Sequence, residues 1–207
     1  MRNVLFVTSS LLGENAKSRQ VGAELVARVG GTHARVVERH LTPDNIPHLT
    51  LETLGALGVA ADQRSPVQSA AVQFADQIIE EVEAADVIVI GAPMYNFSIP
   101  STLKAWFDYI ARAGRTFKYT ANGPEGQLKG KKIYVIASRG GYYTGESPAR
   151  GMDFQEPYIR GFWGFLGVTD VNFIHVEGQA IGGEAAAKGV AAARTAVEKI
   201  ELPALAA

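Results

Sequence analysis

Five short apolar segments rich in valine and isoleucine recur along the chain, separated by longer stretches. They read NVLFVT (3–8), ARVVERH (34–40), DVIVIGAP (86–93), KIYVIAS (132–138) and DVNFIHV (170–176). The first, third and fourth are apolar without alternation, which is typical of strands buried on both faces of a parallel sheet. Parallel strands need crossover connections of a dozen residues or more, and the intervening stretches supply that length.

The intervening stretches carry the spacing of amphipathic helices. Apolar residues recur at three- and four-residue steps in 66–84 and in 100–113, and the Ala-rich segment 184–200 predicts a C-terminal helix. Strands that alternate with helices predict an α/β protein with helices on both faces of the sheet. Five strands favour the doubly wound, flavodoxin-like order 2-1-3-4-5. The 207 residues show no repeat or linker, so we predict one domain, 1–207.

Composition excludes several classes of function. Twenty Lys and Arg residues balance 21 Asp and Glu residues, which leaves no basic face for nucleic acid or a membrane surface. No cysteine is present, which removes disulfides, thiolate catalysis and Cys-ligated metals. The four histidines have no metal-ligand spacing, and we expect no metal site. The first apolar run is too short for a signal segment, and we expect a cytoplasmic protein.

Two connections are longer than a compact domain needs. Residues 40–65 contain turn formers with room for one short helix, and residues 115–130 separate a helix from a strand. Ordered loops beyond about 12–15 residues are usually functional. The second connection contains Phe117 and Tyr119, and we interpret it as a binding or subunit-contact element.

Hydroxyl and amide groups follow the first strand, in SSLLGENAKSRQ (9–20). Ser9, Ser10, Ser18, Asn15 and Lys17 offer donors where a helix begins, which is the usual setting for a phosphate. The alternative is an ordinary Ser or Asn helix cap.

Two further turns follow the third and fourth strands. PMYNF (93–97) combines an amide with three apolar side chains that could cover a ring, and the alternative is an aromatic turn packed in the core. SRGG (138–141) lets backbone N–H groups approach a ligand and adds the Arg139 cation; the alternative is a plain glycine turn. All three turns follow strands that end at the same edge of the predicted sheet. This shared position predicts a ligand site more strongly than any single turn does.

Missing motifs narrow the ligand. The sequence contains no GxGxxG, no GxxxxGK[ST] and no GxSxG, which disfavours a docked pyrophosphate, a nucleoside triphosphate or a serine hydrolase site. A monophosphate that carries a flat heteroaromatic ring remains, and flavin mononucleotide (FMN) fits that description.

The segment APMYNFSIPSTLKAWFDYIARAGRTFKYTANGPEG, followed by SRGG, resembles the family of FMN-dependent NADH-azoreductases, also described as NADH:quinone oxidoreductases. The likeness extends over nearly the whole chain. It implies a flavodoxin-like homodimer with one FMN per subunit near the interface. It also implies that the phosphate is held by Ser10, Ala16, Lys17 and Ser18, the flavin ring by Met94, Tyr95, Asn96 and Phe97, and its pyrimidine edge by Ser138, Arg139, Gly140 and Gly141.

The resemblance further implies a substrate pocket walled by Phe97, Tyr119 and Phe162, partly from the neighbouring subunit. Ala16 departs from the family, whose members often carry serine there, so one hydroxyl donor to the phosphate is missing.

The implied reaction is a ping-pong transfer of two electrons from NADH or NADPH, through the flavin, to quinones and aromatic azo compounds. No protein side chain acts as the catalyst. Arg64 is a candidate partner for the extra phosphate of NADPH. The alternative function is an electron-carrier flavodoxin, although the near-neutral chain shows no plain charged docking face; a regulatory flavoprotein is a third reading.

Overall fold

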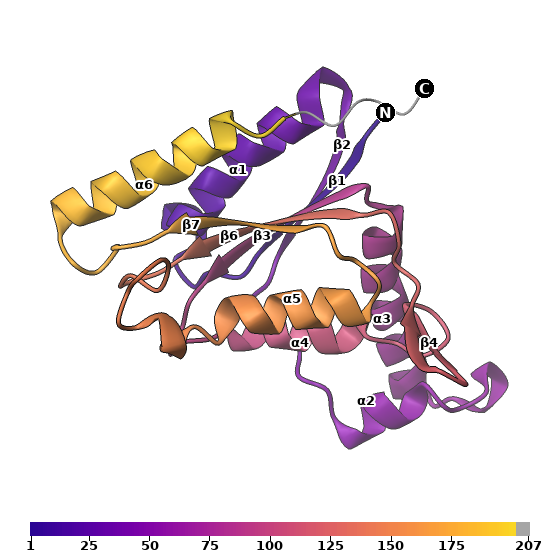
Figure 1. Ribbon diagram of the computed structural model, residues 1–207. Coiled ribbons are helices and arrows are strands. Elements are labelled where there is room, and N and C mark those ends of the chain that lie inside the picture. Colours follow the sequence, from indigo (N-terminus) through magenta and orange to yellow (C-terminus); the bar gives the residue numbers. More distant parts are fainter. Residues whose placement is uncertain (202–207) are drawn as a thin grey trace.

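The computed structural model describes residues 1–201, and its centre is one sheet of five parallel strands (Figure 1). The order is β2-β1-β3-β6-β7, and each neighbouring pair is parallel. The predicted order 2-1-3-4-5 is confirmed, with β6 and β7 as its fourth and fifth strands. The strands are β1 (Asn3–Thr8), β2 (Arg35–His40), β3 (Val87–Pro93), β6 (Lys132–Ser138) and β7 (Val171–Val176).

Successive residues of the central strands feed two separate cores. Along β3, Ile88 and Ile90 belong to one apolar cluster, whereas Val87 and Val89 belong to the other. Side chains alternate across a strand, so a strand that is covered on both faces must be apolar at every position. All seven residues of β3 are buried, as its unbroken apolar sequence predicts.

Helices cover both faces of the sheet (Figure 1). One face carries α1 (Lys17–Gly30) and α6 (Gly183–Glu198). The other carries α3 (Pro66–Ala84), α4 (Ser101–Ile110) and α5 (Gln155–Phe165). The predicted helix 66–84 matches α3, whose first turn is closed by a capping box between Ser65 and Gln68.

The predicted helix 100–113 ends early, at Ile110. The Thr116 hydroxyl donates a 2.5 Å hydrogen bond to the Ile110 carbonyl, and Ala111 leaves the helical conformation. A buried threonine that follows in sequence therefore terminates α4, in place of the glycine at 114.

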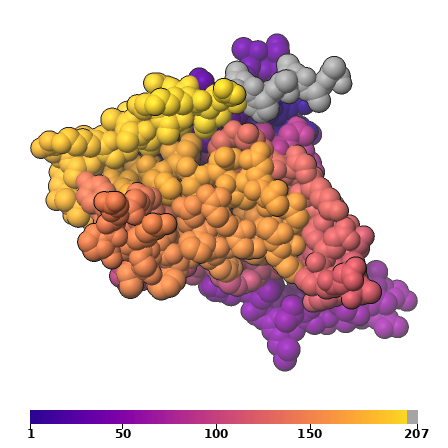
Figure 2. Space-filling view, in the orientation of Figure 1, coloured from indigo at the N-terminus to yellow at the C-terminus, as the bar shows by residue number. Residues whose placement is uncertain are grey.

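Two elements lie where the sequence predicts none. Helix α5 is one, and a small antiparallel hairpin of β4 (Phe117–Thr120) and β5 (Gly123–Gly126) is the other. The connection 40–65 contains the short helix α2 (Leu51–Ala56). In Figure 2 the α2 region and the hairpin project from the same end of the molecule. No helix within residues 1–201 has the length and apolar character that crossing a membrane requires.

Candidate active site

Three connections leave the sheet side by side at the carboxyl ends of β1, β3 and β6. The Ser9 N–H donates to the Gly91 carbonyl at 3.1 Å, and the Met94 N–H donates to the Ser138 carbonyl at 2.8 Å. These bonds join all three turns at the edge toward which the arrowheads of β3 and β6 point in Figure 1. Ligands of open α/β sheets bind beyond this edge.

The first turn leads into an uncapped helix. Ala16 is the N-cap of α1 and offers no side-chain oxygen, so the N–H groups of Lys17 and Ser18 have no partner in the described chain. The buried Ser18 hydroxyl likewise has no partner there. A helix N-terminus favours negative charge, and an unpaired buried hydroxyl costs stability. The donors at this end of α1 therefore fit a phosphate oxygen.

Other residues of this loop have different surroundings. The Ser10 hydroxyl accepts from the Leu12 N–H at 3.3 Å and lies 3.4 Å from the Tyr95 hydroxyl, so the first two turns touch. Lys17 is exposed, and its ammonium donates to Gln20 at 3.1 Å. The Ala16 methyl is buried, at 2% exposure.

The second turn is a strained, two-residue hairpin. Asn96 and Phe97 have φ angles of 47° and 72°, in the left-handed region, and Tyr95 and Ser98 exchange hydrogen bonds of 3.0 and 3.1 Å around them. Asparagine tolerates this region, whereas a phenylalanine there is uncommon and costs on the order of 1–3 kcal/mol. Both residues are exposed, with Phe97 at 40%. The interpretation as an aromatic turn packed in the core is therefore wrong.

The third turn presents backbone donors. The carbonyls of Gly140 and Gly141 accept from Ala180 at 2.9 Å and from Gly178 at 3.1 Å. The N–H groups of the same two glycines have no partner among residues 1–201. This arrangement agrees with the expectation that SRGG offers amides to a ligand.

The expectation that Arg139 also presents a cation is not met. Its side chain is fully buried and pairs with Asp153 at 2.9 Å and Glu177 at 3.4 Å. Gln155 accepts from the Arg139 Nε at 3.2 Å. Sequence reasoning missed all three partners. The one available signal was Glu177, an acidic residue directly after an apolar strand, at the same edge of the sheet as the candidate site.

Comparison with known proteins connects this site to one family. The family described as having a flavodoxin-like fold matches residues 2–200. The FMN-dependent NADH:quinone oxidoreductase of Burkholderia pseudomallei is 46% identical over 202 residues, which cover 97% of this chain and 100% of the relative. The chain belongs to this family of FMN-dependent NADH:quinone oxidoreductases. The resemblance stated from the sequence is thereby confirmed.

Further members and solved structures agree. The FMN-dependent NADH:quinone oxidoreductase of Azotobacter vinelandii is also 46% identical over 202 residues, covering 97% of this chain and all of that protein. The crystal structure of an azoreductase from Bacillus anthracis has a TM-score of 0.86 and 29% identity, and the match covers 96% of this chain and 98% of that one. This member of the oxidoreductase family therefore shares the fold along almost its whole length.

Two residues of the expected substrate pocket, Phe162 and Tyr119, lie away from the three turns in this oxidoreductase chain. Phe162 stacks on Phe107 of α4, with ring centroids 4.0 Å apart, and lies about 10 Å along α5 from Gln155. Tyr119 is on the hairpin, is 76% exposed and contacts Phe117 edge-to-face. The hairpin meets the far end of α5, where the Leu128 N–H donates to Leu166 at 2.9 Å. Within one subunit, therefore, only Phe97 of the predicted pocket is beside the turns.

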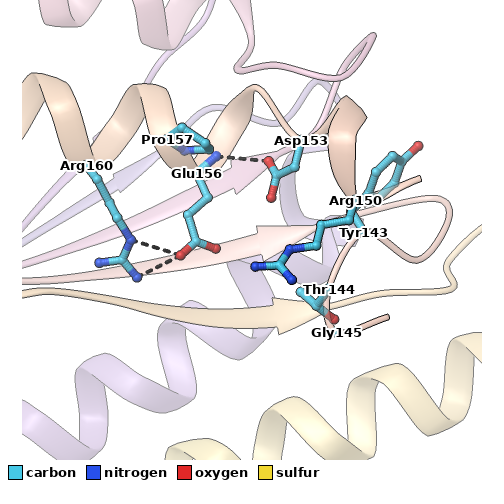
Figure 3. A pocket seen from close by; sticks show the side chains of 8 residues that line it. All are labelled: Tyr143, Thr144, Gly145, Arg150, Asp153, Glu156, Pro157 and Arg160. Carbon is cyan, nitrogen blue, oxygen red and sulfur yellow. Dashed lines mark hydrogen bonds and ion pairs between the residues drawn. The ribbon is translucent and has the colours of Figure 1, made fainter. Parts of the chain in front are cut away.

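A hollow of about 470 Å³ lies beside the third turn of the oxidoreductase (Figure 3). Glu156 lies at its centre; it accepts from Arg160 at 2.9 and 2.7 Å and pairs with His175 at 2.9 Å. The hydrogen bond from His175, followed by that from Arg160, lowers the pKa of Glu156 from 4.5 to about 2. The hollow is lined by Tyr143, Thr144, Gly145, Arg150, Asp153, Glu156, Pro157 and Arg160.

No group of three or more His, Asp or Glu side chains in residues 1–201 is arranged to hold a metal ion.

Proposed function

We propose that this chain is an FMN-dependent NADH:quinone oxidoreductase that also reduces aromatic azo compounds. The observation that carries the proposal is the uncapped start of α1, where the N–H groups of Lys17 and Ser18 and the buried Ser18 hydroxyl lack partners in the described residues. Three unpaired donors lie within the first turn of this helix, as a monophosphate site requires, and the two adjoining turns offer an aromatic surface and free amides.

Each turn has a distinct task toward FMN. The start of α1 and Ser10 hold the phosphate. The turn Met94-Tyr95-Asn96-Phe97 places apolar surface against the ring. The Gly140 and Gly141 amides donate to the pyrimidine edge, where negative charge collects on reduction, as donors do in an oxyanion site. Bound FMN would supply the redox chemistry itself, a two-electron exchange in ping-pong order between the nicotinamide and the acceptor.

The acceptor site requires a second subunit. Tyr119 and Phe162 lie far from the turns of their own chain, and Tyr119 is mostly exposed. A symmetric homodimer can bring these residues to the partner's flavin, because each two-fold interface repeats the same contact twice. Aromatic walls select flat molecules with little further discrimination, which suits quinones and azo compounds alike.

NADH is the proposed electron donor. Arg64, the candidate partner for the NADPH phosphate, donates its Nε to the Val59 carbonyl at 3.0 Å. The hollow that Arg64 lines is also lined by Glu80, whose carboxylate repels a phosphate. The absence of cysteine from the whole sequence suits a reducing compartment, and we place the enzyme in the cytoplasm.

Anaerobic titration of the FMN-loaded protein with NADH tests the proposal. We expect NADH to bleach the bound flavin and benzoquinone or an azo dye to restore its colour without any protein partner. A protein that is colourless after incubation with excess FMN and removal of the unbound FMN contradicts the cofactor assignment. Bound FMN that NADH leaves oxidised contradicts the enzyme assignment and favours an electron carrier.

A further inference from the structure

The most deeply buried charged group of the described chain lies directly behind the third turn. The Arg139 side chain has 0% exposure, and the Asp153 and Glu177 side chains that pair with it have 12% and 11%. A buried cation is tolerated only when its partners compensate the loss of water. Two carboxylates face one guanidinium here, so one negative charge is left over.

Backbone and hydroxyl donors satisfy that surplus charge. Asp153 Oδ1 accepts from the N–H groups of Gln155 and Glu156, both at 3.0 Å, at the start of α5. Glu177 accepts from the Tyr143 N–H at 2.8 Å and the Thr144 hydroxyl at 2.6 Å. Figure 3 shows the bond from Glu156 to Asp153. Both carboxylates are thus well satisfied, whereas the Arg139 Nη2 meets Asp153 at 2.9 Å as an ion pair without hydrogen-bond geometry. A buried network of this kind fixes the segments that it joins.

The network includes one turn of the candidate flavin site and reaches a second. Arg139 belongs to the third turn, Glu177 directly follows β7, Asp153 lies just before α5, and Gln155 is the first residue of α5. The Gln155 amide donates in turn to the Ala92 carbonyl at 3.1 Å, at the end of β3 just before the second turn. One buried arginine therefore links the second and third turns through a single glutamine.

The same region fixes the direction of the free amides. The Arg139 carbonyl accepts from Gln179 at 3.1 Å, and the Gly140 carbonyl accepts from Ala180 at 2.9 Å. The described chain has no cis peptide, and a trans peptide points its N–H opposite to its C=O. The N–H groups of Gly140 and Gly141 are consequently aimed away from residues 178–180.

We propose that Arg139 is a positioning residue, whose buried guanidinium holds the Gly140 and Gly141 amides in the orientation that stabilises the negative charge of reduced FMN. This inference rests on the proposed FMN-dependent function. It assigns Arg139 an effect on the redox potential of the cofactor without contact between the guanidinium and the flavin. A misaligned amide forms a weaker hydrogen bond, and the loss is largest where charge develops. The binding of reduced FMN should therefore weaken more than the binding of oxidised FMN.

Two substitutions test the proposal without changing the net charge. Arg139→Lys keeps the cation but loses the planar set of donors that reaches Asp153, Gln155 and Glu177 together. Gln155→Met removes only the link to Ala92 and to the Arg139 Nε, and it remains informative if Arg139→Lys does not fold. Arg150→Lys is the matched control, because this nearby arginine is exposed and outside the network.

The readouts are the midpoint potential of bound FMN, the dissociation constant of oxidised FMN from fluorescence quenching, and the unfolding temperature. In both test variants we expect the preference for reduced over oxidised FMN, expressed as the ratio of the two dissociation constants, to fall at least tenfold. For a two-electron couple this lowers the potential by about 30 mV. The Arg150→Lys control should keep the wild-type potential.

A folded, FMN-loaded Arg139→Lys or Gln155→Met protein with the wild-type potential would overturn the positioning role while leaving the proposed function intact. A lowered unfolding temperature with an unchanged potential has the same meaning, because it shows a merely structural role. Wild-type protein that fails to bind FMN rejects the proposed function itself, before any variant is compared.

Discussion

At the scale of single residues, Ser18 is where folding and ligand binding oppose each other. Its hydroxyl is buried without a partner in the described chain, which costs the protein without ligand on the order of 1–3 kcal/mol. A phosphate oxygen would turn that cost into a hydrogen bond to a charged group. The same atom should therefore destabilise the empty protein and stabilise the complex.

Ser18→Ala should separate these two effects. We expect the unfolding free energy of the FMN-free protein to stay constant or rise by up to about 1 kcal/mol. The dissociation constant for FMN should rise about tenfold or more, since a hydrogen bond to a charged group contributes about 1.5–3 kcal/mol. Chemical denaturation and fluorescence titration measure the two quantities.

Ser9→Ala is the matched control for that experiment. The Ser9 hydroxyl donates to the Gly91 carbonyl at 3.0 Å, so its loss should destabilise the protein and leave FMN affinity nearly unchanged. If Ser18→Ala behaves like this control, the Ser18 hydroxyl has no role in holding a phosphate.

Side-chain roles were the least predictable part of the site. The position of SRGG after an apolar strand follows from the sequence, because strand ends are marked by their composition. The partners of Arg139 do not, because Asp153 and Glu177 lie 14 and 38 residues away in sequence and meet it only through α5 and β7. The left-handed φ of Phe97 was equally hidden, since phenylalanine normally avoids that region.

At the scale of elements, Glu156 fastens α5 to the edge strand β7 through His175. Its pKa is lowered to about 2, so the folded state favours the ionised carboxylate more than the unfolded state does. This contribution is present above the ordinary pKa of 4.5 and is lost as the pH falls toward 2.

Glu156→Gln should therefore destabilise the protein above about pH 4.5 and make progressively less difference below it. Denaturant unfolding of wild type and variant at a series of pH values gives the difference directly. Glu184→Gln, which removes an exposed partner of Lys188 on α6, should show no comparable pH dependence. A stability difference for Glu156→Gln that stays constant down to pH 2 would contradict the assigned role.

The junction between the hairpin and α5 depends on one glycine. A Cβ added to Gly126 would overlap the backbone of Leu166 and Gly167, which no rotamer change relieves. Gly126→Ala should cost at least about 3 kcal/mol, by unfolding free energy, because two backbone segments must separate. Gly55→Ala in α2 is the control: its Cβ meets open space, and a gain of about 0.5–1 kcal/mol is expected. Equal stabilities of the two variants would show that the junction is loose.

The predictability of the elements follows the strength of their local signals. The five strands and α3 were predicted because unbroken apolar runs and a 3.6-residue repeat are local properties. Helix α5 was missed because Pro157, Gly161 and Gly164 interrupt its pattern, and the Asp153 side chain that starts it is recognisable only in the fold. The hairpin was missed because β5 reads GPEG, which has no strand propensity, and its packing against α5 holds it in place.

At the scale of the whole molecule, the proposed acceptor site is divided between two ends of one chain. The cofactor turns lie at the carboxyl edge of the sheet, whereas the strand β4, which contains Tyr119, lies near the far end of α5 (Figure 1). A two-fold dimer in which these ends meet would complete two sites at once. Such a dimer would then be required for the reaction.

Subunit complementation tests this division. Ser18→Asp places a carboxylate where the phosphate should bind and should abolish FMN binding. Phe162→Ala should damage the wall that a subunit lends to its partner and should also remove the stacking on Phe107 in its own subunit, while leaving its own phosphate site intact. Each variant alone should be nearly inactive with NADH and benzoquinone. Refolding an equal mixture makes about half of the dimers mixed, and each mixed dimer has one intact site, so about a quarter of wild-type activity should return. If Phe162 serves its own subunit instead, every site in the mixture contains a defect and no activity returns.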